Sequence, residues 1–291
     1  MTDSALDVFT AQRGRLFGIA YRMFGTVAEA EDVVQDVWLC WQGADRDAVV
    51  NPAAYLATIA TRLSIRQLTS VRARREHYVG QWLPEPVDTS TDPLLGAERS
   101  EALSVAMLVL LERLTPEERA TFVLHEAFAY PHARIAEVLE VSEVNARQLL
   151  RRARKRLATE RRRPVDAHER DRLLGAFIAA AQNGNLEELE AVLAADVVSI
   201  SDGGGQSRAA LRPVVGSHNV ARFLLGLLEK FGDGIRPVPV NVNGGPGVLG
   251  VRAGRPVALW TLDAGPDGVR QAFLMVNPQK LSRFEGFAAL S

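Results

Sequence analysis

The sequence predicts a multidomain protein in which two all-helical parts precede an α+β domain. Up to about residue 160, apolar residues recur at spacings of three and four, as they do along one face of a helix. Beyond residue 190, short valine-rich runs resemble strands and are separated by Gly and Pro turns. The chain of 291 residues is long enough for two or three domains. Helices followed by a sheet indicate an α+β domain at the end.

The composition is that of an ordinary soluble protein, with 47% hydrophobic and 24% charged residues. The formal charge of −1 hides a strong asymmetry between basic and acidic segments. Cys40 is the only cysteine and the five histidines lie far apart, so we expect no disulfide, no metal site and no cofactor. The first residues do not resemble a signal peptide. No apolar run reaches about 18 residues, so we expect a cytoplasmic protein that does not associate with a membrane.

Residues 4–24 have a helical pattern, with Leu6 and Phe9 at the start of its apolar stripe and Gly25 at its end. Thr26 and Glu29 are spaced as a capping box that begins a second helix. That helix buries Ala30, Val33, Val34, Val37 and Trp41. Its other side carries an acidic patch beside an aromatic residue: Asp32, Gln35, Asp36 and Trp38. Such a face is either a solvated helix surface or a protein-docking surface.

A third helix opens at Asn51-Pro52 and ends in a basic segment. The arginines of this segment are Arg62, Arg66, Arg72, Arg74 and Arg75, followed by His77, Tyr78 and Trp82. Cations interleaved with aromatic rings suit single-stranded or distorted DNA. The alternative is a helix whose last turns carry cations that interact favourably with its dipole.

Residues 80–93 contain three prolines and several acids, which indicates a linker without regular structure. Because Trp82-Leu83 is too apolar for a solvated tether, we expect it to dock on a folded surface. Residues 98–128 predict two more helices. The second begins at Thr115-Pro116, where a capping box and a proline at the first helical position coincide.

Residues 131–163 predict a helix-turn-helix. A short helix from Pro131 ends at Glu140, a turn position where Gly is preferred because it accepts a left-handed backbone. Ser142 is a good N-cap for the second helix. Ala146, Leu149, Leu150, Ala153 and Leu157 share one face of that helix. Residues 142–163 hold nine Lys/Arg and two Glu, a charge of +7, which favours DNA binding over a merely solvated basic face.

The last part predicts two helices, around Leu173–Ala181 and Leu186–Leu193, separated by Asn183-Gly184-Asn185. Five strand-like runs follow, which we expect to form an antiparallel sheet. They are residues 197–200, 238–242, 248–251, 256–262 and 270–276. Asp196, Asp202, Asp263 and His218 form no acid–base pair recognisable from the sequence, so we predict no catalytic residues and no enzyme.

Five segments of the chain resemble a known family. Ala30–Asp36 looks like the second conserved region of extracytoplasmic-function (ECF) sigma factors, and residues 112–157 look like the fourth. Three further segments resemble the signatures of the SigJ-like subgroup, which carries a SnoaL-like C-terminal domain with a curved-sheet cone. These segments are Trp82–Pro86, Asp202–Gly205 and Asn277–Leu281. Gln279 stands where the subgroup usually has Asp, and Arg66 stands where region 2 often has Asp.

The resemblance implies sigma region 2 at 1–79, a linker at 80–97, region 4 at 98–160, a linker at 161–168 and a regulatory domain at 169–291. It implies a cytoplasmic promoter-specificity subunit that binds core RNA polymerase, through the β′ clamp helices and the β flap, and promoter DNA. The acidic patch would bind the clamp helices, and Arg62, Arg66, Arg72, Arg74 and Arg75 the −10 element. The −35 element would be contacted by Arg147, Gln148, Arg151 and Arg152, with Arg154 and Lys155 on phosphates.

The resemblance also implies a fused regulator. Its contacts with the sigma domains would involve Trp82, Leu83, Pro84, Asp202, Gly203, Gly204, Gly205, Asn277, Pro278, Lys280 and Leu281, and no separate anti-sigma factor would be needed. The glycines lack the Lys and Ser/Thr of a phosphate loop and predict a tight turn with close backbone approach. The alternative function is a helix-turn-helix regulator with a ligand-binding or enzymatic C-terminal domain.

Overall fold

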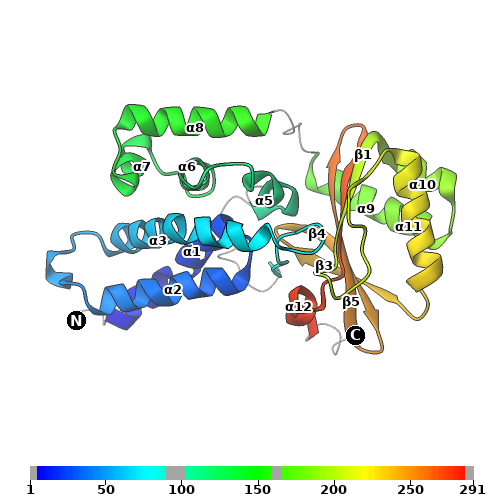
Figure 1. Cartoon of the computed structure of the whole chain (residues 1–291), viewed down its shortest axis with the longest axis horizontal. Helices are drawn as coiled ribbons and strands as arrows, with labels where there is room; N and C mark the ends of the chain where they lie inside the picture. The colour runs from blue at the N-terminus through cyan, green and yellow to red at the C-terminus, as the bar shows by residue number, and fades with distance from the viewer. Residues whose placement is uncertain (1–4, 90–102, 159–164, 286–291) are drawn as a thin grey trace. The chain divides into compact units, whose positions relative to one another are not determined.

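The computed structural model describes residues 5–89, 103–158 and 165–285 and divides into two compact units (Figure 1). The N-terminal unit comprises Met1–Glu76 and Thr91–Arg161, and the C-terminal unit comprises His77–Ser90 and Arg162–Ser291. Residues 77–79, which the prediction placed in region 2, and residues 80–90 of the predicted linker therefore group with the C-terminal unit. Residues 77–89 are called the linker from here on. The rest of the predicted linker, the basic residues 161–163 and the start of the helix predicted from residue 98 lie outside the described residues.

The N-terminal unit begins with three helices, α1 (Ala5–Phe24), α2 (Val27–Gln42) and α3 (Pro52–Arg75), with the short 3₁₀ turn η1 (Arg46–Ala48) before α3. The predicted apolar stripe of α1 is buried from Phe9 onward, but Leu6 is 57% exposed because it precedes the packed part of the helix. The capping box at Thr26 was also wrong. Thr26 is the N-cap of α2, yet its hydroxyl makes no capping hydrogen bond.

The second half of this unit contains α5 (Val105–Leu111), α6 (Pro116–Glu126), α7 (His132–Leu139) and α8 (Glu143–Ala158). The capping box of α6 is confirmed, because Thr115 Oγ1 accepts from the Glu118 amide while Glu118 accepts from the Thr115 amide. Ser142 caps α8 as predicted, accepting from the Asn145 amide at 3.2 Å. Glu140 ends α7 in the left-handed conformation, with φ 55°. The predicted helix-turn-helix is thus confirmed.

The C-terminal unit is built on a six-stranded sheet in the order β2-β1-β6-β5-β4-β3. The strands are β1 (Leu193–Asp202), β2 (Val214–Val215), β3 (Arg236–Val242), β4 (Gly245–Arg252), β5 (Arg255–Gly265) and β6 (Gly268–Met275). The predicted fully antiparallel sheet was wrong, since β1 and β6 run parallel. These strands are joined by a long crossover that contains helix α11 (Ser217–Phe231) and four strands, rather than by a hairpin.

Helices α9 (Ala167–Gln182), α10 (Leu186–Val192) and α11 (Ser217–Phe231) pack on this sheet (Figure 1). Their shared core includes Phe177, Leu189, Val197, Val220 and Leu224. After β6, the chain forms the short helix α12 (Pro278–Leu281) and the 3₁₀ turn η3 (Ser282–Phe284). Strand β2 and helix α11 were not predicted. None of the described helices has both the length and the apolar content needed to cross a membrane.

The two threonine caps allow a matched test of the fold. Thr115→Ala removes a real capping hydrogen bond and should lower the free energy of unfolding by about 1 kcal/mol. Thr26→Ala removes a hydroxyl without a capping bond and should change that free energy by less than about 0.5 kcal/mol. Urea unfolding followed by circular dichroism measures both. Equal losses in the two variants would contradict the assignment of the caps.

Candidate nucleic-acid interface

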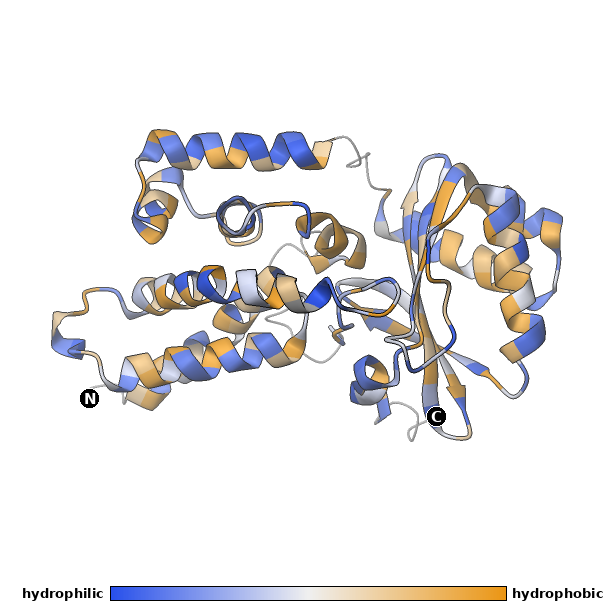
Figure 2. Ribbon diagram, in the orientation of Figure 1, coloured by the Kyte–Doolittle hydropathy of each residue, from blue (hydrophilic) through white to orange (hydrophobic). Residues whose placement is uncertain are grey.

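Helix α8 separates an apolar face from a basic one (Figure 2). Its predicted apolar residues are buried against the unit. All the predicted −35 contacts are exposed on the other side: Arg147, Gln148, Arg151, Arg152, Arg154 and Lys155. The helix therefore presents cationic donors to solvent along its length, as a recognition helix in the major groove requires.

Some of these basic side chains are paired within the unit. Arg152 Nε lies 3.3 Å from Glu118, and Arg154 Nη2 lies 2.6 Å from Glu126. Arg147 pairs with Glu143 in the first turn of α8. Within the part of the chain that the structure describes, no hydrogen bond or ion pair holds the side chains of Gln148, Arg151 and Lys155.

The predicted −10 segment makes contacts with the second half of the unit. Arg62 donates to the carbonyl oxygens of Val138 (2.8 Å) and Glu137 (3.1 Å), and it lies 2.8 Å from the Glu140 carboxylate. Arg134, which the sequence reasoning did not select, donates to the Ala54 carbonyl. Helices α3 and α7 are thus joined by arginines in both directions. Arg62, which the prediction assigned to DNA, is therefore already engaged by α7 in this structure.

Arg75 belongs to a buried cluster around Glu112. The Glu112 carboxylate lies 2.7 Å from Arg75 and 2.5 Å from Arg119. Burial alone would raise the pKa of Glu112, but the two guanidinium groups outweigh it and hold the pKa below its usual range. Arg75 also donates to the Phe24 carbonyl. Arg66 is exposed, and the side chains of Arg72 and Arg74 lie outside the described part.

The acidic face of α2 is largely open to solvent. Asp32 and Gln35 are exposed, whereas Asp36 and Trp38 are half-buried. The Asp36 carboxylate accepts a hydrogen bond from the Gln67 side-chain amide at 3.1 Å. The ring centroids of Trp38 and Phe9 lie 4.9 Å apart. Next to this patch Leu39 is 57% exposed, an apolar contact point that the sequence reasoning did not select.

The three signature segments meet one another inside the C-terminal unit, around Asp202. This carboxylate is completely buried. It accepts from Tyr78 Oη (2.6 Å), the Leu83 amide (2.9 Å), the Gly204 amide (3.0 Å) and Lys280 Nζ (2.7 Å). Burial, and the hydrogen bond and charge of Asp202, raise the pKa of the Tyr78 phenol above its usual value.

Lys280 links the linker to the end of the chain. Its ammonium donates to the Leu83 carbonyl at 2.5 Å and lies 5.0 Å from the Tyr78 ring centroid and 4.8 Å from that of Trp82. Such cation–π contacts strengthen when water is excluded. Tyr78 and Trp82, which the sequence reasoning placed among rings for DNA bases, instead enclose this lysine. That interpretation of the two rings was wrong.

The glycine-rich turn fits closely against these segments. A Cβ on Gly203 would lie 2.2 Å from the Ser207 carbonyl oxygen, and one on Gly204, at φ +59°, would lie 2.2 Å from Asn277 Nδ2. The prediction of a tight turn with close backbone approach is confirmed. Gln279 is exposed and contributes its backbone amide to Asn277 Oδ1. Its side chain therefore stands outside the network that Asp202 organises.

The remainder of the linker joins the sheet edge. The Thr89 amide donates to the Asn241 carbonyl (3.1 Å), and the Asn243 amide donates to the Val87 carbonyl (2.9 Å). Glu85 accepts from Arg283 at 2.9 Å. Since β3 is the last strand of the sheet, the two backbone bonds satisfy polar groups at an otherwise open edge. The predicted docking of Trp82-Leu83 on a folded surface holds, and Leu83 is buried.

Comparison with known proteins identifies both helical regions. The Sigma-70 region 2 model matches residues 8–75 and the Sigma-70, region 4 model matches residues 104–157. The ECF RNA polymerase sigma factor SigJ of Mycobacterium tuberculosis (strain H37Rv) is 41% identical over 288 residues, covering 89% of this chain and 91% of that protein. The probable ECF RNA polymerase sigma factor SigI of the same species is 31% identical, covering 66% and 67%.

The same relationship appears in three dimensions. The crystal structure of M. tuberculosis SigJ matches with a TM-score of 0.76 at 35% identity, covering 95% of this chain and 98% of that one. The match includes the C-terminal unit as well as the two helical regions. The chain therefore belongs to the extracytoplasmic-function RNA polymerase sigma factors, in the SigJ-like subgroup with a fused α+β domain.

Proposed function

We propose that this sigma factor reads the −35 element of its promoters with the exposed face of α8, working in the cytoplasm on core RNA polymerase. The observation that carries the proposal is the division of α8 into a buried apolar face and an exposed basic face. Gln148 and Arg151 are the leading candidates for base contacts because neither is held by a pair within the described chain. Arg147, Arg152, Arg154 and Lys155 supply the surrounding positive charge for base and phosphate contacts.

The polymerase contact is assigned to the acidic face of α2. This face combines the exposed Asp32 and Gln35 with the half-buried Asp36 and Trp38, and Leu39 adds exposed apolar area beside them. Charged groups around an apolar contact suit a protein partner. We assign the β′ clamp helices to this face and the β flap to the region 4 part, as the family resemblance implies.

The −10 contact requires a change in the N-terminal unit. Arg62 is engaged by α7 through two carbonyls and Glu140, so it becomes available to DNA only when that contact opens. The Arg62–Glu140 pair is exposed, with side chains 45% and 74% accessible, and such pairs contribute little. The contact therefore acts as a weak latch between the two sigma regions.

Regulation is assigned to the C-terminal unit through the linker. Residues 77–89 lie in the sequence between the region 2 and region 4 matches, and their hydrogen bonds tie them to Asp202, Lys280 and β3. By holding this segment, the C-terminal unit limits how the two sigma regions can be spaced. A covalently attached regulator acts at high effective concentration, so we propose that no separate anti-sigma factor is needed.

Arg151→Ala tests the promoter reading. A guanidinium that grips a guanine edge contributes about 1–3 kcal/mol of discrimination, so run-off transcription with core RNA polymerase should fall about tenfold or more. Binding to core polymerase should remain unchanged. Arg172→Ala removes an exposed arginine of α9 and should leave transcription unaltered. If the wild-type chain binds promoter duplex tightly without polymerase and yields no transcript, the chain acts as a helix-turn-helix regulator instead.

Glu140→Gln tests the latch. Loss of the pair with Arg62 should raise run-off transcription at limiting sigma factor by up to about fivefold, as expected for an exposed pair of about 0.2–1 kcal/mol. Glu117→Gln is the control. It removes the same charge from an exposed position of α6 and leaves both Arg62 and the basic face of α8 untouched. An equal rise in both variants would mean that the removed negative charge, and not the latch, is responsible.

Lys280→Met tests the regulatory linker. It leaves the buried Asp202 carboxylate without its cation, a change that costs about 3–5 kcal/mol, and should release residues 77–89 from the C-terminal unit. Limited proteolysis should then cut this segment faster, and transcription output should change while −35 duplex binding stays the same. Lys230→Met, an exposed lysine of α11, should do neither. If residues 77–89 are cut faster but transcription output does not change, linker binding does not regulate transcription and the proposal is wrong.

A further inference from the structure

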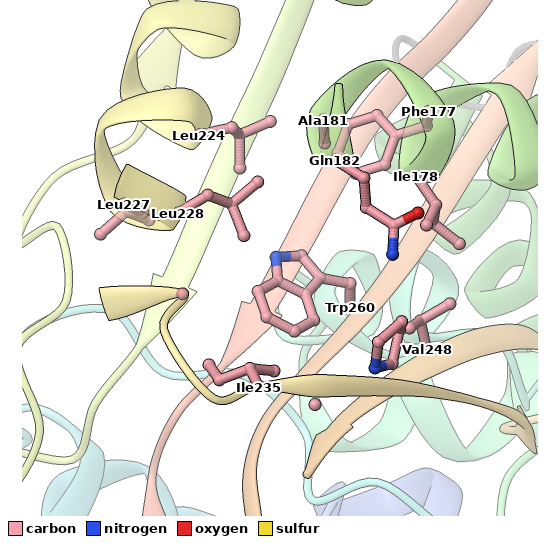
Figure 3. A pocket seen from close by; sticks show the side chains of 13 residues that line it. Phe177, Ile178, Ala181, Gln182, Leu224, Leu227, Leu228, Ile235, Val248 and Trp260 are labelled. Carbon is pink, nitrogen blue, oxygen red and sulfur yellow. The ribbon is translucent and has the colours of Figure 1, made fainter. Parts of the chain in front are cut away.

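The C-terminal unit contains a pocket that the sigma-factor function does not use. It lies between α9, α11 and the sheet, with a volume of about 360 Å³ (Figure 3). The side chains that define its walls are Phe177, Leu224, Leu228, Ile235, Val248 and Trp260. Ligand pockets for small molecules typically measure about 300–1,000 Å³ and have mostly apolar walls.

The strand register separates this pocket from the linker site. Trp260 pairs with Val248 and with Leu274 across the neighbouring strands. The adjacent residue Leu259 pairs with Met275, which in turn pairs with Asp202. Because successive side chains of a strand point to opposite faces, Trp260 lies on the face covered by the helices and Asp202 on the other. A molecule can therefore occupy the pocket without displacing the linker.

The size of the pocket favours a small molecule over a protein segment. Two helices and three strands contribute to its wall. A helix with its side chains is about 10–12 Å across and would not fit a hollow of this volume. The apolar side chains that line the pocket lack dispersion contacts on the side that faces the hollow. An apolar ligand would supply these contacts and stabilise the unit.

The chemistry of the wall defines the class of ligand. None of the described residues that line the pocket is charged. An ionised group would lose its hydration there without gaining a partner. The polar groups at hand are the Gln182 amide and the indole N–H of Trp260, and Figure 3 shows both side chains directed at the hollow. A ligand could use them for one or two hydrogen bonds, and the Trp260 ring could pack against a flat ring system.

We propose that this pocket binds a small, uncharged and largely apolar molecule, ring-shaped in part, with one or two hydrogen-bonding groups. The C-terminal unit is then a ligand-binding module as well as the holder of the linker. The two sites occupy opposite faces of one sheet, with Trp260 of β5 lining the pocket and Asp202 of β1 binding the linker. The binding proposal itself does not depend on how transcription is regulated.

The uncharged fluorescent probe N-phenyl-1-naphthylamine tests the pocket in the full-length chain. Its fluorescence should rise on binding and saturate at one molecule per chain, and the probe should raise the midpoint of thermal unfolding. Ala181→Phe places a ring in the pocket wall and should weaken binding at least tenfold. Ala179→Phe makes the same change at an exposed position of α9 and should bind as the wild type does.

Three outcomes would overturn the proposal. Signal that does not saturate, or equal binding by the wild type and Ala181→Phe, would place the probe elsewhere on the chain. If Ala181→Phe does not fold, Leu228→Trp fills the pocket from α11 and gives the same test. Competition by 1-naphthol and by 1-naphthoate at pH 8 tests the ligand class. The neutral compound should displace the probe at least ten times better, and equal displacement would contradict an uncharged ligand.

Discussion

The buried carboxylate of Asp202 is the interaction on which the C-terminal unit depends most. A charge removed from water is tolerated only when it is paired and fully hydrogen-bonded. Asp202 meets this requirement with donors from separate parts of the chain, since Tyr78 and Leu83 come from the linker and Lys280 from α12. Without the linker the carboxylate would lose two of these donors. The bound linker therefore contributes to the stability of the C-terminal unit itself.

The N-terminal unit uses one half-buried and one buried glutamate in a similar way. Glu112 holds Arg75 and Arg119 between the two sigma regions, and Glu118, only 2% exposed, holds Arg156 of α8 at 2.6 Å. Such pairs orient the helices at the cost of removing the glutamate carboxylates from water, most completely at Glu118. The exposed contact between Arg62 and Glu140 differs because water can replace either partner cheaply. The contacts within the N-terminal unit are therefore of two kinds. The exposed Arg62–Glu140 pair is weak, whereas the pairs of Glu112 and Glu118 are costly to break.

The sequence allowed prediction of features that depend on local patterns. Periodicity located α1–α3 and α6–α8, and the Thr115 capping box followed from residue spacing. Thr26 has the same spacing but no capping bond, because a cap also depends on backbone geometry. The signature segments were recognisable individually, yet their meeting at Asp202 depends on contacts between residues more than a hundred positions apart. The parallel pairing of β1 with β6 is likewise set by the tertiary fold.

The ion pairs within the N-terminal unit also determine how easily each basic residue of α8 can move to DNA. The side chain of Glu118 is almost fully buried and its two oxygens are shared by Arg152 and Arg156, so moving both arginines to DNA would leave an uncompensated buried charge. The Glu126 carboxylate is more accessible, and Arg154 can exchange it for a phosphate at lower cost. Gln148 and Arg151 face no such competition within the described chain. In the proposed function, the centre of the helix therefore contacts bases and the cations near its end bind phosphates.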